Sequence, residues 1–362
     1  MSKKGYLLLA DGQLFEGELR GAHKNVMAEL VFTTAMVGYL ETLTDPSYEG
    51  QIVIQTFPTI GNYGVIPEDF ESGKPWLSGY IAREICDDPN NFRCQGKLDD
   101  FLRDKGIPCL TGVDTRALTR RIRSAGVMNA AILTEKPKDI AAMAEELRHL
   151  PFHPAVQDVS CEGTVDDGMQ GKYHVVLWDF GAKANIRREL EKRGCHVTSV
   201  NADATCEDIL ALNPDGIMLS NGPGDPADNV GIIEQLRTLC THRIPTFGIC
   251  LGHQLLALSQ GASTRKLKYG HRGANQPAKD VKTGLSYMTS QNHGYAVDSD
   301  TLPANASLRF INGNDGTCEG VDYTDMPAFS VQFHPEAAGG PLDTRFLFDR
   351  FIALMGGNKV CH

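Results

Sequence analysis

The chain has 362 residues, of which 41% are hydrophobic and 22% charged, a balance typical of a globular protein with more than one domain. Its formal net charge of −10 argues against a nucleic-acid partner, because phosphate backbones are bound by surplus lysine and arginine. No run of residues approaches the roughly 18 apolar positions that a membrane-spanning helix needs. The short apolar run 7–10 is followed by a turn signal and not by a cleavage site, so we expect no signal peptide and a cytoplasmic location.

The cysteines predict reduced thiols. Ten of them are scattered along the chain, with no Cys-x-x-Cys pair and no Cys/His cluster at zinc spacing. We therefore expect no metal site, and we expect most cysteines to be small buried hydrophobic side chains in a reducing compartment.

Residues 1–150 are predicted to form a smaller, mixed α/β amino-terminal domain. Its predicted strands cover 6–9, 14–16, 28–33 and 51–56, and its predicted helices cover 114–123 and 137–149. The first two strands flank Asp11-Gly12, which predicts a hairpin. Residues 151–172 contain prolines, several acids and weak periodicity, so they are predicted to form a linker.

Residues 173–362 are predicted to form an α/β domain with a mostly parallel sheet. Strands predicted at 174–179, 195–200, 216–219, 246–249 and 328–333 are accompanied by helices predicted at 185–193, 204–212, 230–241 and 252–258. Such alternation indicates a sheet with helices on both faces, and ligands then bind beyond the carboxyl ends of the strands.

A candidate nucleophile stands at one of these strand ends, in Gly248-Ile249-Cys250-Leu251-Gly252. A nucleophile between a strand and a helix needs small flanking residues, because the turn is so tight that its centre has strained dihedral angles. The helix that follows directs its N-terminal N–H groups toward the sulfur and favours a thiolate, and the Leu251 N–H is placed to donate to an oxyanion. The alternative interpretation is a buried structural cysteine between two coincidental glycines.

His334 is the strongest candidate for the general base, with Glu336 as its orienting carboxylate. A residue before proline takes extended dihedral angles, and in an extended chain residues i and i+2 point to the same side. One ring nitrogen can then be held by the carboxylate while the other faces the sulfur. His253 is a weaker candidate because it lies on the helix, and an ordinary His-Pro-Glu turn is the other interpretation. His271 and His293, in glycine-rich segments, could be loop residues near the site.

A third segment, 219–226, follows the strand 216–219 and contains Gly222 and Gly224. Glycines at the carboxyl end of a strand let backbone N–H groups approach a substrate closely. A phosphate-binding loop is excluded, because no G-x-x-x-x-G-K-[ST] pattern is present. The segment is predicted to cradle an oxyanion or a carboxamide, with a plain turn as the alternative.

Together these segments resemble the signatures of class I, triad-type glutamine amidotransferases. They are Ser-Asn-Gly-Pro-Gly-Asp at 220–225, Phe-Gly-Ile-Cys-Leu-Gly-His-Gln at 247–254 and Phe-His-Pro-Glu at 333–336. The family hydrolyses the side-chain amide of glutamine through a glutamyl thioester and supplies ammonia to a synthetase. The rest of the chain, from about residue 5 to residue 354, resembles carbamoyl phosphate synthetase small chains. The matching stretches are 31–39, 41–48, 60–64, 112–119, 179–183, 270–275 and 290–295.

The resemblance implies Cys250 as nucleophile, His334 as base and Glu336 as its orienter. It implies that L-glutamine is held by Ser47, Gly222, Gly224, Leu251, Gln254, Asn292, Gly294 and Tyr295. Because Ser47 comes from the first domain, the resemblance also implies that both domains contribute to the active site. Family members often carry Phe at the position of Tyr295, which a backbone contact would tolerate.

The resemblance further implies a large partner chain, in a heterodimer or a higher assembly. This chain shows no ATP-binding apparatus, so no cofactor is expected in it, and ATP and Mg²⁺ are expected in the partner. The product would be carbamoyl phosphate for arginine synthesis, pyrimidine synthesis or both. The alternatives are an amidotransferase subunit of another synthetase, a cysteine peptidase or γ-glutamyl hydrolase with the same elbow, and a non-enzymatic subunit.

Overall fold

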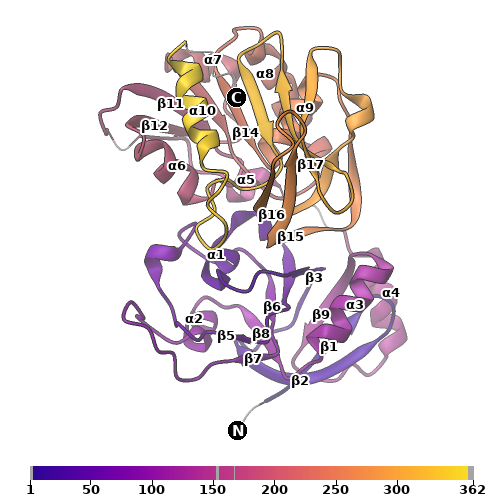
Figure 1. Ribbon diagram of the computed structural model, residues 1–362. Coiled ribbons are helices and arrows are strands. Elements are labelled where there is room, and N and C mark those ends of the chain that lie inside the picture. The colour runs from indigo at the N-terminus through magenta and orange to yellow at the C-terminus, as the bar shows by residue number, and fades with distance from the viewer. Residues whose placement is uncertain (1–2, 152–154, 167, 358–362) are drawn as a thin grey trace. The chain divides into compact units, whose positions relative to one another are not determined.

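A computed structural model describes residues 3–151, 155–166 and 168–357, and the chain divides into two compact units, Met1–Pro154 and Ala155–His362 (Figure 1). The division falls inside the predicted linker 151–172. Part of that segment belongs to the second unit, as helix α5 (Val156–Val159) and strand β10 (Thr164–Asp166). Elements this short show no periodicity, which is why the sequence predicted a linker here. Residues 152–154 and 167 of that segment lie outside the described residues.

The first unit contains a closed barrel. Its strands, in barrel order, are β1 (Lys3–Leu9), β2 (Leu14–Gly21), β8 (Pro108–Thr111), β6 (Gly79–Ile81), β4 (Gln51–Gln55), β3 (Val26–Thr33) and β9 (Met128–Leu133). The predicted β1–β2 hairpin is confirmed, and Gly12 takes a φ of 89° in its turn. Around the barrel lie α1 (Tyr39–Thr44), α2 (Leu98–Asp104), α3 (Thr115–Ala125) and α4 (Ile140–His149), with the short strands β5 (Thr59–Ile60) and β7 (Glu84–Ile85).

Two of these helices were predicted, and both are confirmed. The Asp114 side chain accepts a hydrogen bond from Ala117 N at the start of α3, and the Asp139 side chain accepts one from Ala142 N at the start of α4. Such caps satisfy N–H groups that have no partner within the helix. Helix α4 begins three residues after the predicted start at Pro137, because its cap is Asp139.

The second unit is built on one large mixed sheet. Its strand order is β10, β12 (Cys195–Val200), β11 (Tyr173–Trp178), β13 (Gly216–Leu219), β14 (Thr246–Ile249), β19 (Ala328–Val331), β18 (Cys318–Tyr323), β17 (Ala306–Asn312), β15 (Thr264–Asp280) and β16 (Ser286–Val297). The strands from β12 to β19 in this order are parallel to one another, as the α/β alternation predicts. The strands from β18 to β16 extend the sheet antiparallel, an extension that the sequence did not indicate.

Helices cover both faces of the parallel strands, as expected (Figure 1). On one face, α7 (Cys206–Ala211), α8 (Val230–Cys240) and α9 (Leu251–Ser259) pack with alternate strand residues such as Val176 and Trp178. On the other face, α6 (Ala184–Glu191) and α10 (Phe346–Met355) pack with Val175 and Leu177. This alternation is the period of two that a strand buried on both sides requires. None of the helices in the described part of the chain combines the length and apolarity that a membrane crossing requires.

Candidate active site

Cys250 lies between β14 and α9 in a strained backbone conformation. Its φ is 54° and its ψ is −103°, a region that residues with a side chain rarely occupy. Its N–H donates to the Val331 carbonyl of the neighbouring strand at 2.9 Å, which holds the turn against the sheet. The residue is 2% exposed. Strain of this kind, held in place by surrounding structure, is characteristic of functional residues.

The glycines on either side of Cys250 are required by close packing. A Cβ on Gly252 would lie 2.4 Å from the Leu219 carbonyl oxygen, and a Cβ on Gly248 would lie 2.7 Å from the Gly252 carbonyl oxygen. The Gly252 N–H also donates to the Ser220 carbonyl at 2.9 Å. The helix therefore begins so close to β13 that only glycine fits, which gives the G-x-C-x-G pattern a steric cause.

His334 and Glu336 follow β19 and form a buried pair. His334 Nδ1 lies 2.6 Å from Glu336 Oε1, and the two side chains have 0% exposed area. The His334 N–H donates to the Ser290 carbonyl at 2.9 Å, which ties this segment to β16. The carboxylate sets the ring orientation and leaves Nε2 as the nitrogen available for chemistry.

A third charged group, Lys183, stands beside this pair. Its Nζ lies 3.8 Å from Glu336 Oε1, and Lys183 directly precedes α6, in the segment that follows β11. Burial raises the pKa of Glu336, but His334 and Lys183 oppose this and hold it below its ordinary value. The sequence reasoning assigned Lys183 no role, although its position beyond a strand end was the available signal.

The Cys250 side chain interacts electrostatically with the His334 ring and affects its pKa. Burial and the Lys183 ammonium lower the pKa of His334, but Glu336 and Cys250 raise it by more, to about 9. The Cys250 Sγ is directed at the Asn292 carbonyl at 3.7 Å. The site therefore brings together a cysteine thiol, an imidazole ring and a carboxylate.

His253, the other candidate base, lies in a different environment. It is fully buried on α9, and its Nδ1 lies 2.8 Å from Ser330 Oγ under the helix. Burial lowers the pKa of His253 to about 3, so the ring is neutral at physiological pH. These contacts favour a packing role for His253.

The loop containing Gly222 and Gly224 is pinned to the loop that precedes α6. The Phe180 N–H donates to Ser220 Oγ at 2.8 Å, and the Lys183 N–H donates to Asn221 Oδ1 at 3.0 Å. A Cβ on Gly222 would lie 2.2 Å from the Phe180 carbonyl oxygen, and Gly224 takes a φ of 87°. Both glycines are thus required by the backbone path at this edge of the sheet.

The other predicted glutamine contacts of this unit converge on one stretch of β16. Gln254 Nε2 donates to the Tyr295 carbonyl at 2.8 Å and to Gln332 Oε1 at 2.9 Å. Asn292 lies next to Cys250 through its carbonyl, and Gly294 lies between Asn292 and Tyr295 on the same strand. Leu251 begins α9, where the first N–H groups have no partner within the helix.

Ser47 belongs to the first unit. It lies in the turn Pro46–Tyr48, and its N–H donates to Asp45 Oδ1 at 2.9 Å. Its predicted contact with glutamine stays a prediction.

A second polar cluster lies close to the site and was missed by the sequence reasoning. His271, His293 and Glu319 are buried, and each offers one possible metal-ligating atom within 4.8 Å of the others. The sequence placed the two histidines near the site as loop residues, but both lie in strands, β15 and β16. Glu319 carried no signal at all, because it becomes a neighbour only through the pairing of distant strands.

Two family models match the chain. The model for the CPSase domain of the carbamoyl-phosphate synthase small chain matches residues 7–132, and the model for class-I glutamine amidotransferases matches residues 176–354. Together they span most of both units.

Curated relatives match nearly the whole chain. A carbamoyl phosphate synthase small chain from Symbiobacterium thermophilum is 47% identical, over 97% of this chain and 99% of the relative. The protein of the same name from Staphylococcus epidermidis is 49% identical, over 98% of this chain and 97% of the relative. That from Listeria monocytogenes is 47% identical, over 98% of both chains.

Proposed function

The chain belongs to the family of carbamoyl phosphate synthase small chains, which are glutamine amidotransferases, and we propose that it hydrolyses glutamine through a thioester on Cys250. The observation that carries the mechanism is the buried His334–Glu336 pair, whose ring has its pKa raised to about 9 by Glu336 and by Cys250. A ring that holds a proton at neutral pH beside a strained cysteine is suited to a thiolate mechanism.

In the first half of the reaction, the Cys250 thiolate attacks the side-chain carbonyl carbon of glutamine. The oxygen of the tetrahedral intermediate is stabilised by backbone N–H groups at the start of α9, Leu251 among them, and in the Gly222 loop. The C–N bond then breaks, and His334 gives its proton to the leaving ammonia. The enzyme is left with a glutamyl thioester and a neutral imidazole.

In the second half, the neutral His334 takes a proton from water, and the resulting hydroxide attacks the thioester. The C–S bond breaks, glutamate leaves, and the thiolate and imidazolium are restored. Glu336 stabilises the charged ring in both halves, and Lys183 keeps Glu336 ionised. Within the second unit, the substrate is held by Gln254, Asn292, Gly294 and Tyr295.

The ammonia is proposed to pass to a large chain that carries ATP and Mg²⁺ and makes carbamoyl phosphate for arginine or pyrimidine synthesis in the cytoplasm. This chain itself is proposed to need no cofactor. Near-complete coverage of the curated small chains supports such a partner, because a small chain implies a large one.

The decisive experiment is steady-state glutamine hydrolysis by the chain alone, with a co-purified large chain, and with that chain plus ATP and bicarbonate. We expect turnover to rise across the three conditions, because a single misplaced oxyanion donor costs on the order of 10²–10³-fold. Equal turnover in all three would contradict the partnership and favour a free-standing γ-glutamyl hydrolase. Activation by a different synthetase would keep the triad and change only the partner.

A further inference from the structure

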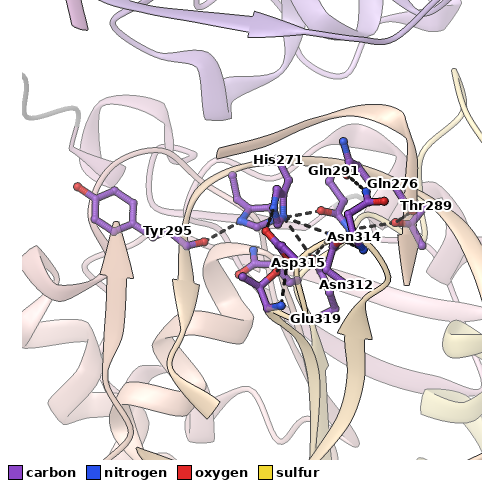
Figure 2. Close-up of polar contacts among 12 residues, drawn as sticks. His271, Gln276, Thr289, Gln291, Tyr295, Asn312, Asn314, Asp315 and Glu319 are labelled. Atoms are coloured by element: carbon purple, nitrogen blue, oxygen red, sulfur yellow. Dashed lines mark hydrogen bonds and ion pairs between the residues drawn. The ribbon is translucent and has the colours of Figure 1, made fainter. Parts of the chain in front are cut away.

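A buried polar network lies beside the proposed glutamine site, on the antiparallel strands of the second unit (Figure 2). At its centre is Glu319 of β18, whose side chain is 0% exposed. His271 of β15 bridges this carboxylate and a half-exposed one: its Nδ1 lies 3.4 Å from Glu319 Oε1, and its Nε2 lies 2.8 Å from Asp315 Oδ2. Burial lowers the pKa of His271, but Glu319 and Asp315 raise it by more, so its pKa lies above the ordinary value of a histidine.

The hydrogen bonds of Glu319 distinguish this network from a metal site. Asn312 Nδ2 donates to Glu319 Oε1 at 2.9 Å and lies 3.4 Å from His271 Nδ1. This amide therefore lies beside the two atoms that a cation shared by Glu319 and His271 would have to contact. The orientation of that amide is set, because Asn312 Oδ1 accepts from the Asn314 N–H. The second carboxylate oxygen, Oε2, accepts from Gln291 Nε2 at 3.0 Å. Both carboxylate oxygens thus face N–H donors, which repel a cation.

From Glu319 the network continues to the proposed substrate contacts. The Gln291 amide is oriented by Thr289, whose hydroxyl donates to the Gln276 carbonyl and so accepts from Gln291 Nε2 at 3.1 Å. Gln291 Oε1 then faces His293 Nε2 at 3.1 Å. His293 Nδ1 lies 2.7 Å from the Tyr295 carbonyl, the same oxygen that accepts from Gln254. Burial lowers the pKa of His293 well below its ordinary value, so the neutral ring donates to one of these two oxygens, Gln291 Oε1 or the Tyr295 carbonyl, at a time.

The backbone of this stretch needs such support, because the β15–β16 ladder is interrupted on both sides of residues 291–293. Regular pairing joins His271 to His293 and Gly273 to Gln291, but the register shifts between Lys266 and His271 and again between Gly273 and Gln276. A short paired stretch between two irregularities is held weakly by the ladder alone. Side-chain hydrogen bonds must then set where residues 291–295 lie.

We propose that Glu319, held by His271, is a positioning residue for glutamine binding: through Gln291 and His293 it sets the place of residues 292–295. The proposal rests on the proposed function, since it takes this stretch as part of the glutamine site. Glu319 acts on substrate only through other residues, and nothing in the sequence near Cys250 or His334 points to it. It is a further determinant of substrate affinity and is not part of the triad.

The test compares Glu319→Ala and Glu319→Gln with wild type in the full chain, alone and with its large partner. Glu319→Ala removes the acceptor of one N–H of Gln291 and one N–H of Asn312, while Thr289 still accepts the other N–H of Gln291. Two lost hydrogen bonds of buried donors correspond to about 10-fold or more in an equilibrium constant. We expect the KM for glutamine to rise about 10-fold while kcat changes less, because the side-chain contacts of Glu319 are with His271, Asn312 and Gln291 and not with the His334 and Glu336 side chains. Glu319→Gln keeps one acceptor oxygen, so its KM for glutamine is expected to lie between those of wild type and Glu319→Ala.

The matched control is Arg309→Met. Arg309 of β17 is as buried as His271, and its Nη2 lies 2.7 Å from Asp280 Oδ2 of β15, so the variant breaks a buried ion pair on the same strands away from residues 291–295. It is expected to lower the melting temperature and leave the KM for glutamine unchanged. Amide hydrogen exchange of residues 290–296 should accelerate in Glu319→Ala and not in Arg309→Met.

An unchanged KM and unchanged exchange in Glu319→Ala would overturn the proposal, and so would an equal rise in KM in Arg309→Met. Stoichiometric zinc in the purified chain that is lost in Glu319→Ala would also overturn it, in favour of a metal site. If wild type itself hydrolyses no glutamine, the proposed function fails, while the exchange measurement still shows whether Glu319 positions this stretch.

Discussion

His334 Nδ1 and Glu336 Oε1 approach to 2.6 Å in a place with no exposed surface, so neither charge is screened by solvent. A buried ion pair is costly to break, because removing one member leaves the other charge without compensation. The nearby Lys183 ammonium lowers the pKa of both groups: it favours the ionised form of Glu336 and disfavours the charged form of the His334 ring. We therefore expect changes in this pair to affect catalysis, stability and the pH dependence of stability.

Replacing the nucleophile should separate the two chemistries of the assembled enzyme. We expect Cys250→Ser to abolish synthesis from glutamine and to leave synthesis from added ammonia intact, because a serine hydroxyl remains protonated in a site suited to a thiolate. Carbamoyl phosphate formation from each nitrogen source is the measurement. Loss of the ammonia-dependent reaction in a well-folded complex would contradict the assignment of Cys250.

The base should matter more than its orienting carboxylate. His334→Asn removes the group that moves protons in both halves of the reaction, a contribution worth roughly 10²–10⁴-fold, whereas Glu336→Ala leaves the ring in place. We expect turnover to fall within that range for His334→Asn and by less for Glu336→Ala. Thioester trapped by acid quench should persist in His334→Asn, and full activity of that variant would move the base elsewhere.

Gly252, two residues after the proposed nucleophile, should not tolerate a side chain. In Gly252→Ala the new methyl would lie 2.4 Å from the Leu219 carbonyl oxygen, so the start of α9 must shift, at a cost of roughly 1–3 kcal/mol or more. The free energy of unfolding in urea measures this. Gly231→Ala on α8 is the control, because a Cβ there meets nothing within 4 Å and alanine favours a helix by about 1 kcal/mol. Equal destabilisation by both changes would show that packing against β13 is not the cause.

Stability should depend on pH above neutrality through His334. Because the folded pKa is raised to about 9, above the unfolded value near 6.5, this ring contributes stability that is complete below pH about 6.5 and is lost as pH rises through about 9. In Glu336→Gln one cause of the raised pKa is removed, so the loss between pH 7 and 9 should be smaller. Melting temperatures of both proteins across this range test the prediction, and parallel curves would contradict it.

Much of the fold and the local parts of the site could be predicted from the sequence. The elbow at Cys250 lies within a few residues of a buried strand and a helix start, and His334 and Glu336 are two positions apart, so near-neighbour rules suffice. The parallel strands of the second unit could likewise be recognised from their apolar runs and the helices between them. The antiparallel extension could not, because β15 and β16 are long, polar and irregular, and their partners are chosen by register.

What the sequence determined by itself is the local arrangement: a cysteine between two glycines at the end of a strand, and a histidine two positions before a carboxylate. What only the tertiary structure decided is the surroundings that tune it, Lys183 beside Glu336 and the Glu319–His271 pair beside residues 292–295. The physical reason is the separation along the chain between the residues that interact. A turn or an i, i+2 pair follows from backbone geometry over a few residues, whereas Glu319 meets His271 across 48 positions only because strands pair in a register that the whole sheet sets.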